Sequence, residues 1–179
     1  AGASRHVIDF YGLGADEARD RHPALFQHLL LTVKPEREQN KREAYRQRWW
    51  VFGEARGSMR AALAGVDRYI VTPLTSKHRL FQAAEAALLP DCQLHAICIE
   101  DVWVLGVLSS QVHTAWSLQA CSWMGVGNAP RWRSGPCFDP FPFPAPTQDQ
   151  RERIDFLARR LDAHRKKVLA AVPKAHLTA

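Results

Sequence analysis

Helix-type and strand-type patterns are separated along this sequence, and the separation limits the possible folds more than any other feature. Apolar residues recur at helical spacing toward both ends of the chain, whereas the β-type runs lie together in the middle. Strands that cluster in the centre, with helices on both sides of them, predict an α+β fold. We expect a central, mainly antiparallel β region flanked by N-terminal helices and a long C-terminal helix.

The first third of the chain is polar and reads as helical. Proline suits a first helical turn, and two prolines here are expected to start or restart a helix. A dense apolar run, Trp49–Phe52, follows these helices. The elements predicted for this part are Pro23–Val33, a second helix over Glu36–Arg48 at a new angle after Pro35, and a short helix capped by Ser58 and ended by Gly65.

The middle of the chain is strand-rich, in short runs separated by polar turns. The strands predicted there are Arg68–Pro73 and His78–Gln82, then Cys92–Ile99 and Val102–Leu108, the last two paired through a tight turn at Glu100 and Asp101. Ser109 or Ser110 is expected to cap a helix that runs to about Ala120.

The last part of the chain begins with a segment rich in Gly, Pro and Trp, residues 122–146, which reads as a loop longer than loops usually are without a function. Thr147 and Gln150 make a capping box for the final helix, which is expected to run to about Val172 and to stop at Pro173. The predicted parts are therefore a helical lead-in at 1–60, a β-rich core at 61–146 and a C-terminal helical segment at 147–179.

Basic residues gather toward the two ends of the chain, which carries a net charge of +6. The balance is +3 in residues 1–60, −1 in residues 61–146 and +4 in residues 147–179. A near-neutral middle between basic flanks suits a protein that approaches a polyanion, with nucleic acid the first candidate. Solvated helix faces that are basic without binding anything are an equally common explanation of such a charge.

The size and composition of the chain indicate a folded protein. With 179 residues, of which 46% are hydrophobic, it can bury a core of one domain or of one and a half small ones. No run approaches the roughly 20 apolar residues of a membrane span, so we expect a soluble protein with no membrane partner. The four cysteines show no CxxC pair and no regular spacing, which favours a reducing cytoplasm. Because the first residue is Ala1, we expect a processed chain or a part of a longer one.

Two motifs resemble cofactor or metal sites but are interpreted as structural. Val7–Gly14 has the G-x-G of a cofactor loop, yet the residues after it read as helical and offer no second strand, so a turn ahead of a helix is predicted. Cys92 and Cys98 would share one face of a strand while His95 points the other way, which favours buried apolar cysteines over a metal site. No cofactor is predicted in this chain.

Two further motifs fall short of a catalytic arrangement. Ser109 and His113 lie one helical turn apart, but no third group is placed to orient the histidine for hydrolysis. Asp139–Pro142 alternates Phe and Pro and lacks the residue order of the loop that amino-group methyltransferases use to hold a flipped base. The sequence therefore predicts no catalytic residues.

Two segments combine side chains that suit nucleic-acid binding. Arginine forks read guanine edges or clamp phosphates, and tryptophan stacks or wedges. The residues concerned are Lys77, His78 and Arg79 in one segment and Arg131, Trp132 and Arg133 in the other. The basic residues of the final helix can touch the DNA backbone, although acidic residues four positions before Arg159 and Lys166 also suit ordinary helix ion pairs.

A series of motifs, in order along nearly the whole chain from about Arg5 to about Val172, resembles one known family. The motifs are Trp49–Arg56, Arg68–Phe81, Gly106–Ser110 followed by His113 and Trp116, Pro130–Ser134, and Phe138–Pro144. The series resembles the target recognition domain and C-terminal helical region of MmeI-like DNA methyltransferases. These restriction–modification enzymes join methylation of the exocyclic amino group of adenine to sequence specificity in one polypeptide, often with an amino-terminal nuclease.

The resemblance implies that this chain reads double-stranded DNA. An upstream methyltransferase domain of the same polypeptide would bind S-adenosylmethionine and transfer the methyl group. Base-reading side chains are implied in the Ser76–Arg79 turn, near Glu100 and Asp101, and in the Arg131–Arg133 loop. From the residues alone two other functions stay open: an interaction or scaffold domain that docks protein rather than DNA, and a self-contained enzyme.

Overall fold

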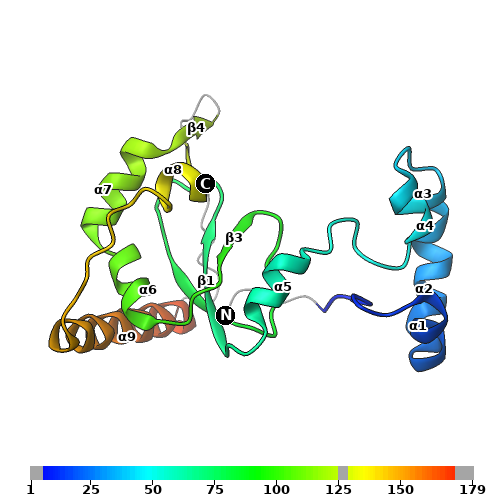
Figure 1. The fold of residues 1–179 in the computed structure, drawn as a ribbon, viewed down its shortest axis with the longest axis horizontal. Helices are drawn as coiled ribbons and strands as arrows, with labels where there is room; N and C mark the ends of the chain where they lie inside the picture. Colours follow the sequence, from blue (N-terminus) through cyan, green and yellow to red (C-terminus); the bar gives the residue numbers. More distant parts are fainter. Residues whose placement is uncertain (1–5, 125–128, 172–179) are drawn as a thin grey trace. The chain divides into compact units, whose positions relative to one another are not determined.

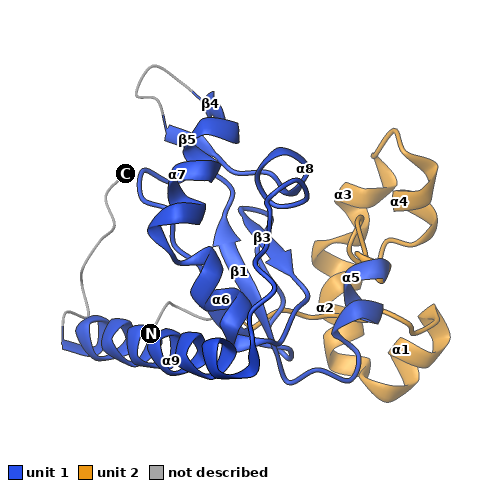
Figure 2. Ribbon diagram, turned by 60° about the vertical axis from the view of Figure 1, so that its left-hand side comes forward, with its two compact units in different colours: residues 1, 58–179 blue, residues 2–57 orange. Residues whose placement is uncertain are grey.

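The computed structural model describes residues 6–124 and 129–171, and the chain divides into two compact units between Gly57 and Ser58 (Figure 1, Figure 2). The first unit, residues 2–57, is helical, and the second, residues 58–179, contains the antiparallel sheets and the longest helix. The predicted α+β fold, with helices before a mainly antiparallel β region and a long C-terminal helix, is confirmed. The chain start at Ala1 and the predicted helix stop at Pro173 lie outside the described residues.

The first unit is built from short helices around aromatic residues. They are α1 (Ala15–Arg21), α2 (Pro23–Thr32), α3 (Lys34–Glu38) and α4 (Glu43–Gln47). Proline occupies the first turn of α2 and of α3, as predicted. The buried rings of Phe26 and Trp49 pack with their centroids 5.1 Å apart, and Phe10 and Val51 complete the buried cluster. The dense apolar run after α4 therefore supplies part of this core.

The prediction of one helix over Glu36–Arg48 is wrong, because the chain turns between α3 and α4. The backbone N–H of Arg42 donates a hydrogen bond to Oδ1 of Asn40 at 2.9 Å. An Asn side chain that bonds the backbone two residues on stabilises a turn and competes with the helix. Asn40 thus separates two charged stretches whose residues both favour a helix.

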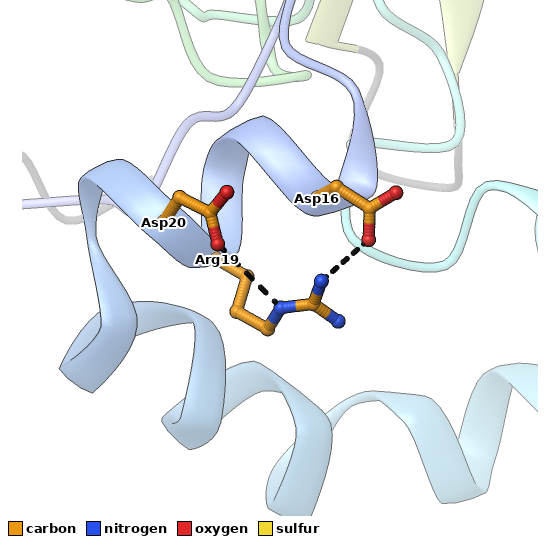
Figure 3. Close-up of polar contacts among 3 residues, drawn as sticks. All are labelled: Asp16, Arg19 and Asp20. Carbon is orange, nitrogen blue, oxygen red and sulfur yellow. Dashed lines mark hydrogen bonds and ion pairs between the residues drawn. The ribbon is translucent and has the colours of Figure 1, made fainter.

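The residues ahead of α1 form the predicted turn. Gly12 has φ +87°, a left-handed conformation that favours glycine, and Gly14 directly precedes α1. On the exposed face of α1, Nη2 of Arg19 lies 2.6 Å from Oδ1 of Asp16, and its Nε lies 3.8 Å from Oδ1 of Asp20 (Figure 3). Ion pairs as exposed as these stabilise a helix only weakly.

Two antiparallel sheets organise the second unit. The first sheet has the order β2-β1-β3, and the second pairs β4 with β5. The strands are β1 (Arg68–Pro73), β2 (Gln82–Glu85), β3 (Leu94–Ile97), β4 (Ser122–Met124) and β5 (Ala129–Arg131). The prediction of a strand over His78–Gln82 is wrong, since β2 begins only at Gln82.

The remaining helices lie before, between and after these strands along the chain. They are α5 (Gly57–Leu63), α6 (Val102–Leu108), α7 (Gln111–Ala120), α8 (Ser134–Cys137) and α9 (Gln148–Ala171). The predicted Ser58 cap is wrong, because α5 already begins at Gly57. Gly65 has φ +91° just after α5, as expected of a residue that ends a helix. Residues 122–146, predicted as one loop, contain β4, β5 and α8.

The prediction that Val102–Leu108 is a strand is also wrong, because these residues form α6. The backbone N–H of Val104 bonds the carbonyl of Asp101 at 3.1 Å and starts the helix, and β3 pairs with β1 instead. A short continuous apolar run fits a buried helix as well as a strand. Glu100 and Asp101 therefore connect a strand to a helix rather than two strands.

The caps predicted for the helices that became α7 and α9 are confirmed. Oγ of Ser110 accepts a hydrogen bond from the backbone N–H of His113 at 3.2 Å at the start of α7. At the start of α9, the backbone N–H of Thr147 donates to Oε1 of Gln150 at 3.0 Å, and the N–H of Gln150 donates to Oγ1 of Thr147 at 3.4 Å. This reciprocal pair is a capping box.

The core of the second unit lies between the first sheet and α6. Its buried residues are Ile70, Phe81, Ile97, Val104, Leu105, Leu108, Trp132 and Cys137. The C-terminal segment predicted as residues 147–179 belongs to the same compact unit, because α9 packs along α6. Among the described residues, no helix combines the length and the apolar character needed to cross a membrane.

Candidate nucleic-acid interface

The tertiary structure brings the two predicted DNA-binding segments side by side. Thr75 and Arg131 form an isolated antiparallel bridge. The backbone N–H of Trp132 donates to the carbonyl of Leu74 at 2.8 Å, and the N–H of Ser76 donates to that of Pro130 at 3.4 Å. The turn after β1 is therefore hydrogen-bonded to β5 and to the residue after it. Segments that the sequence separates by about 50 residues become one surface.

Arg79 holds these two segments together. Its guanidinium donates to Oγ1 of Thr72 at 3.1 Å, to the carbonyl of Pro130 at 3.1 Å, and to the carbonyl of Pro73. Burial lowers the pKa of Arg79, because removal from water disfavours the charged form. The guanidinium that was predicted to contact DNA therefore makes structural hydrogen bonds that link β1 to β5.

Trp132 is a core residue, which corrects the expectation that its ring stacks on DNA. Only 1% of it is exposed, and its ring meets those of Phe81, His95 and Phe138 edge-on. Side chains alternate sides along an extended chain. Pro130 and Trp132 consequently point inward, while the arginines on either side of Trp132 reach solvent.

Four side chains remain for ligand contact, and we call them the basic cluster: Lys77, His78, Arg131 and Arg133. Lys77, His78 and Arg133 are exposed and Arg131 is half-buried. Within residues 6–124 and 129–171, none of the four is in an ion pair. The charges of Lys77, Arg131 and Arg133 are therefore available to an anionic partner.

The neighbouring His95 reports the positive charge of this region. Burial lowers the pKa of this half-buried histidine. The nearby charges of Arg79, Arg131 and Arg133 lower it further, because a positive neighbour disfavours the imidazolium ion. The positive surroundings of His95 therefore disfavour its charged form, although a backbone hydrogen bond at Trp132 acts in the opposite direction.

The structure adds two residues that the sequence did not single out, Trp123 and Met124 of β4. They are 54% and 47% exposed. Trp123 pairs with Pro130 across the second sheet, and Oγ1 of Thr75 lies 4.0 Å from Sδ of Met124. The exposed aromatic ring of this ribbon is thus Trp123 and not Trp132, and because Trp123 pairs with Pro130 it lies on the opposite side of the ribbon from Arg131. The three-residue strand β4 is too short for a period-2 pattern to reveal it.

Glu100 and Asp101 lie away from the basic cluster. In the antiparallel register Ile97 faces Ile70 near the start of β1, whereas the turn that carries Lys77 follows the end of β1. Asp101 forms an ion pair with Arg151 of α9. The structure therefore does not group these two acidic residues with the other predicted base-reading positions, and it places Asp101 in the contact between α6 and α9.

The residues weighed for metal binding and hydrolysis are dispersed. Among the described residues no group of three or more potential ligands could hold a metal ion. Cys92 is exposed and Cys98 is half-buried, so the expectation of a buried apolar role is wrong for Cys92. His113 is buried with Nδ1 3.0 Å from the carbonyl of Leu108, and burial lowers its pKa. Its ring also packs edge-on against Phe141, so it is enclosed rather than presented to a substrate.

The arrangement therefore offers two guanidinium groups and one ammonium group, none of them in an ion pair within the described residues, to an anionic ligand. Comparison with family models, with curated proteins and with solved structures finds no match to this chain. The resemblance to MmeI-like DNA methyltransferases accordingly stays a prediction, and the comparisons add no support to it.

Proposed function

We propose that this chain is the sequence-specific DNA-recognition part of an adenine-specific DNA methyltransferase. The observation that carries the proposal is the basic cluster, assembled from two distant segments, one of which belongs to a ribbon whose other side exposes the ring of Trp123. None of its cationic side chains has an ion-pair partner in the described part of the chain. An unpaired set of arginines and lysine favours a nucleic-acid partner over a neutral ligand.

The chemistry of each group assigns it a role in this proposal. Arg131 and Arg133 each offer a guanidinium fork, which reads O6 and N7 of guanine or clamps a phosphate. Lys77 is a point charge suited to a phosphate. Trp123 offers a face for stacking, or a wedge between base steps. The β4–β5 pair is a two-stranded ribbon, and a ribbon of this kind fits the major groove of DNA.

The wider setting of the proposal rests on the family resemblance alone. An upstream domain of the same polypeptide would bind S-adenosylmethionine and methylate adenine. This chain would supply specificity and no catalytic residue. We place the enzyme in the cytoplasm, where DNA and the cofactor meet.

The test compares Arg131→Gln, Arg133→Gln and Lys77→Gln with the control Arg19→Gln, which removes one positive charge in the first unit. The wild-type chain first selects its preferred sites from a pool of random duplexes, and binding is then measured by fluorescence anisotropy over a series of salt concentrations. A base contact should cost about 1–3 kcal/mol at one base pair and relax specificity there. Loss of a phosphate contact should weaken binding to all DNA sequences equally, and should make the slope of log affinity against log salt concentration shallower by roughly 0.9.

If all three variants bind DNA as the control does, the basic cluster is not a DNA site. Complete absence of DNA binding, also with the upstream polypeptide attached, would favour the interaction or scaffold domain. Methyl transfer by the isolated chain with S-adenosylmethionine would instead establish a self-contained enzyme.

A further inference from the structure

An apolar groove of about 480 Å³ lies in the second unit, away from the basic cluster. It is bounded by α6, by the start of α7, by the proline-rich segment before α9 and by α9 itself. The residues that line it are Gly106, Val107, Ser109, Ser110, Val112, Phe141, Pro142, Pro144, Ile154, Leu157, Ala158 and Leu161. Both ribbon views place α9 at one end of this unit and β4 at the other (Figure 1, Figure 2).

The walls of this groove leave large apolar side chains in solvent. Val112 is 71% exposed, Leu157 is 53% exposed and Leu161 is 36% exposed. An amphipathic helix normally turns its apolar stripe toward a core. The buried residue of α9 is Ala158, so its large apolar side chains are left without full cover in the described structure. Contiguous apolar surface of this kind marks an interaction site.

Small residues make the groove deep enough to accept side chains. A Cβ placed on Gly106 would lie 2.6 Å from Cγ2 of Ile154 and 3.2 Å from Cβ of Ala158. This close approach brings α6 and α9 together, and Leu157 and Val112 are the most exposed large apolar side chains that line the groove. From Ile154 to Leu161 the groove wall spans roughly 10 Å of helix, which matches about two turns of a docked helix.

Two arginines flank Leu157 at helical spacing on one side of the apolar stripe of α9, whereas Asp155 and Asp162 lie on its other side, where Asp162 pairs with Lys166. Arg153 and Arg160 each directly precede a lining residue of α9, and both are exposed. In the residues that the structure describes, neither forms an ion pair with a carboxylate. Arg160 lies over the ring of Phe156, 5.5 Å from its centroid. The lining itself carries no charged side chain. The site therefore combines an apolar floor with a basic rim.

We propose that this groove docks an amphipathic helix of a partner polypeptide, with leucine-type side chains facing Leu157 and Val112 and acidic residues facing Arg153 and Arg160. Charge complementarity selects this partner. A second copy of the chain carries a net charge of +6 and would bring the same arginines to the same rim. The proposal is independent of DNA recognition, because the groove shares no residue with the basic cluster.

The probe is a fluorescein-labelled synthetic helix of about 15 residues, roughly four turns, with leucine along one face and glutamate on both flanks. A matched peptide carries lysine in place of each glutamate. Binding to the full chain is followed by fluorescence anisotropy. The protein variants are Leu157→Ala in the groove and Leu88→Ala outside it, two leucines that are 53% and 48% exposed, so neither change should unfold the protein.

We expect the acidic peptide to bind, and the lysine peptide to bind at least about tenfold more weakly because of the basic rim. Leu157→Ala should weaken binding of the acidic peptide by about tenfold, because it removes a central apolar contact. Leu88→Ala should leave this binding unchanged. Arg153→Gln combined with Arg160→Gln should narrow the difference between the two peptides. Equal binding of both peptides, no binding of either, or a Leu157-dependent dimer in sedimentation would each overturn the proposal.

Discussion

Replacing Arg79 with methionine tests whether this arginine supports the basic cluster from inside or contacts DNA itself. Methionine keeps much of the unbranched side chain but removes every donor. The substitution deprives Thr72, Pro73 and Pro130 of hydrogen bonds from the guanidinium, two of them at 3.1 Å. Thr72 is fully buried and Pro130 is buried, so water replaces these bonds poorly.

The magnitude follows from these bonds. A hydrogen bond from a charged donor contributes about 1.5–3 kcal/mol, and an acceptor left unsatisfied costs about 1–3 kcal/mol. The stabilisation from these hydrogen bonds is offset in part, because placing the guanidinium in a half-buried position costs free energy. The same burial lowers the pKa of Arg79. We therefore expect Arg79→Met to lower the free energy of unfolding by about 3 kcal/mol, and Tm by roughly 10 °C.

The assay is thermal unfolding followed by circular dichroism, with DNA binding measured on the same preparations well below Tm. The control is Arg133→Met, an exposed arginine whose replacement should change stability by less than about 0.5 kcal/mol. Arg79→Lys should recover part of the loss, because a lysine ammonium can reach one of the acceptors. If Arg79→Met leaves Tm unchanged and weakens DNA binding as much as Arg131→Gln does, Arg79 contacts DNA and its structural assignment is wrong.

Three further predictions concern the core. Trp132→Ala should destabilise the protein by about 3–5 kcal/mol in chemical denaturation, whereas Trp123→Ala should leave stability nearly unchanged and weaken DNA binding; the opposite result would return Trp132 to the interface. Gly106→Ala should destabilise by about 1–2 kcal/mol despite a better helix propensity, and a double-mutant cycle with Ile154→Ala should show coupling, since independent effects would contradict the close approach of α6 and α9. Burial lowers the folded-state pKa of His113 from the ordinary value of 6.5. Below that pH the unfolded chain binds a proton that the folded chain does not, so the free energy of unfolding decreases as the pH is lowered. The difference between Tm at about pH 7.5 and Tm at about pH 5 should be smaller in His113→Gln than in the wild type, and an equal difference would show that His113 is not responsible.

Signals that act over a few residues were predicted well from the sequence. The cap at Ser110 and the capping box of Thr147 and Gln150 are confirmed, because a cap bonds the backbone two or three positions away. The strand at Arg68–Pro73 is confirmed for a similar reason, since its β-branched and aromatic residues favour an extended chain locally. The turn at Asn40 is equally local, yet the helical composition on both sides of it masked its effect.

The candidate site could be predicted only in part. Lys77, His78, Arg131 and Arg133 follow from residue type and spacing, but nothing in the sequence shows that their two segments are hydrogen-bonded to each other. Arg79 has the same residue type as its neighbours and a different role, because its hydrogen bonds reach a strand 51 residues away. Their grouping is a property of the β-bridge and not of either segment.

The sequence by itself determined the order of helices and strands, the α+β class and the set of charged residues from which a binding surface can be built. Only the tertiary structure decided that Val102–Leu108 is a helix, since a short apolar run has no preferred partner until α9 packs against it. Only the tertiary structure decided that Trp132 is buried at 1% exposure while Trp123 is 54% exposed. The physical reason is the same in both cases: burial depends on which distant segment covers a side chain, and local sequence carries no record of that contact.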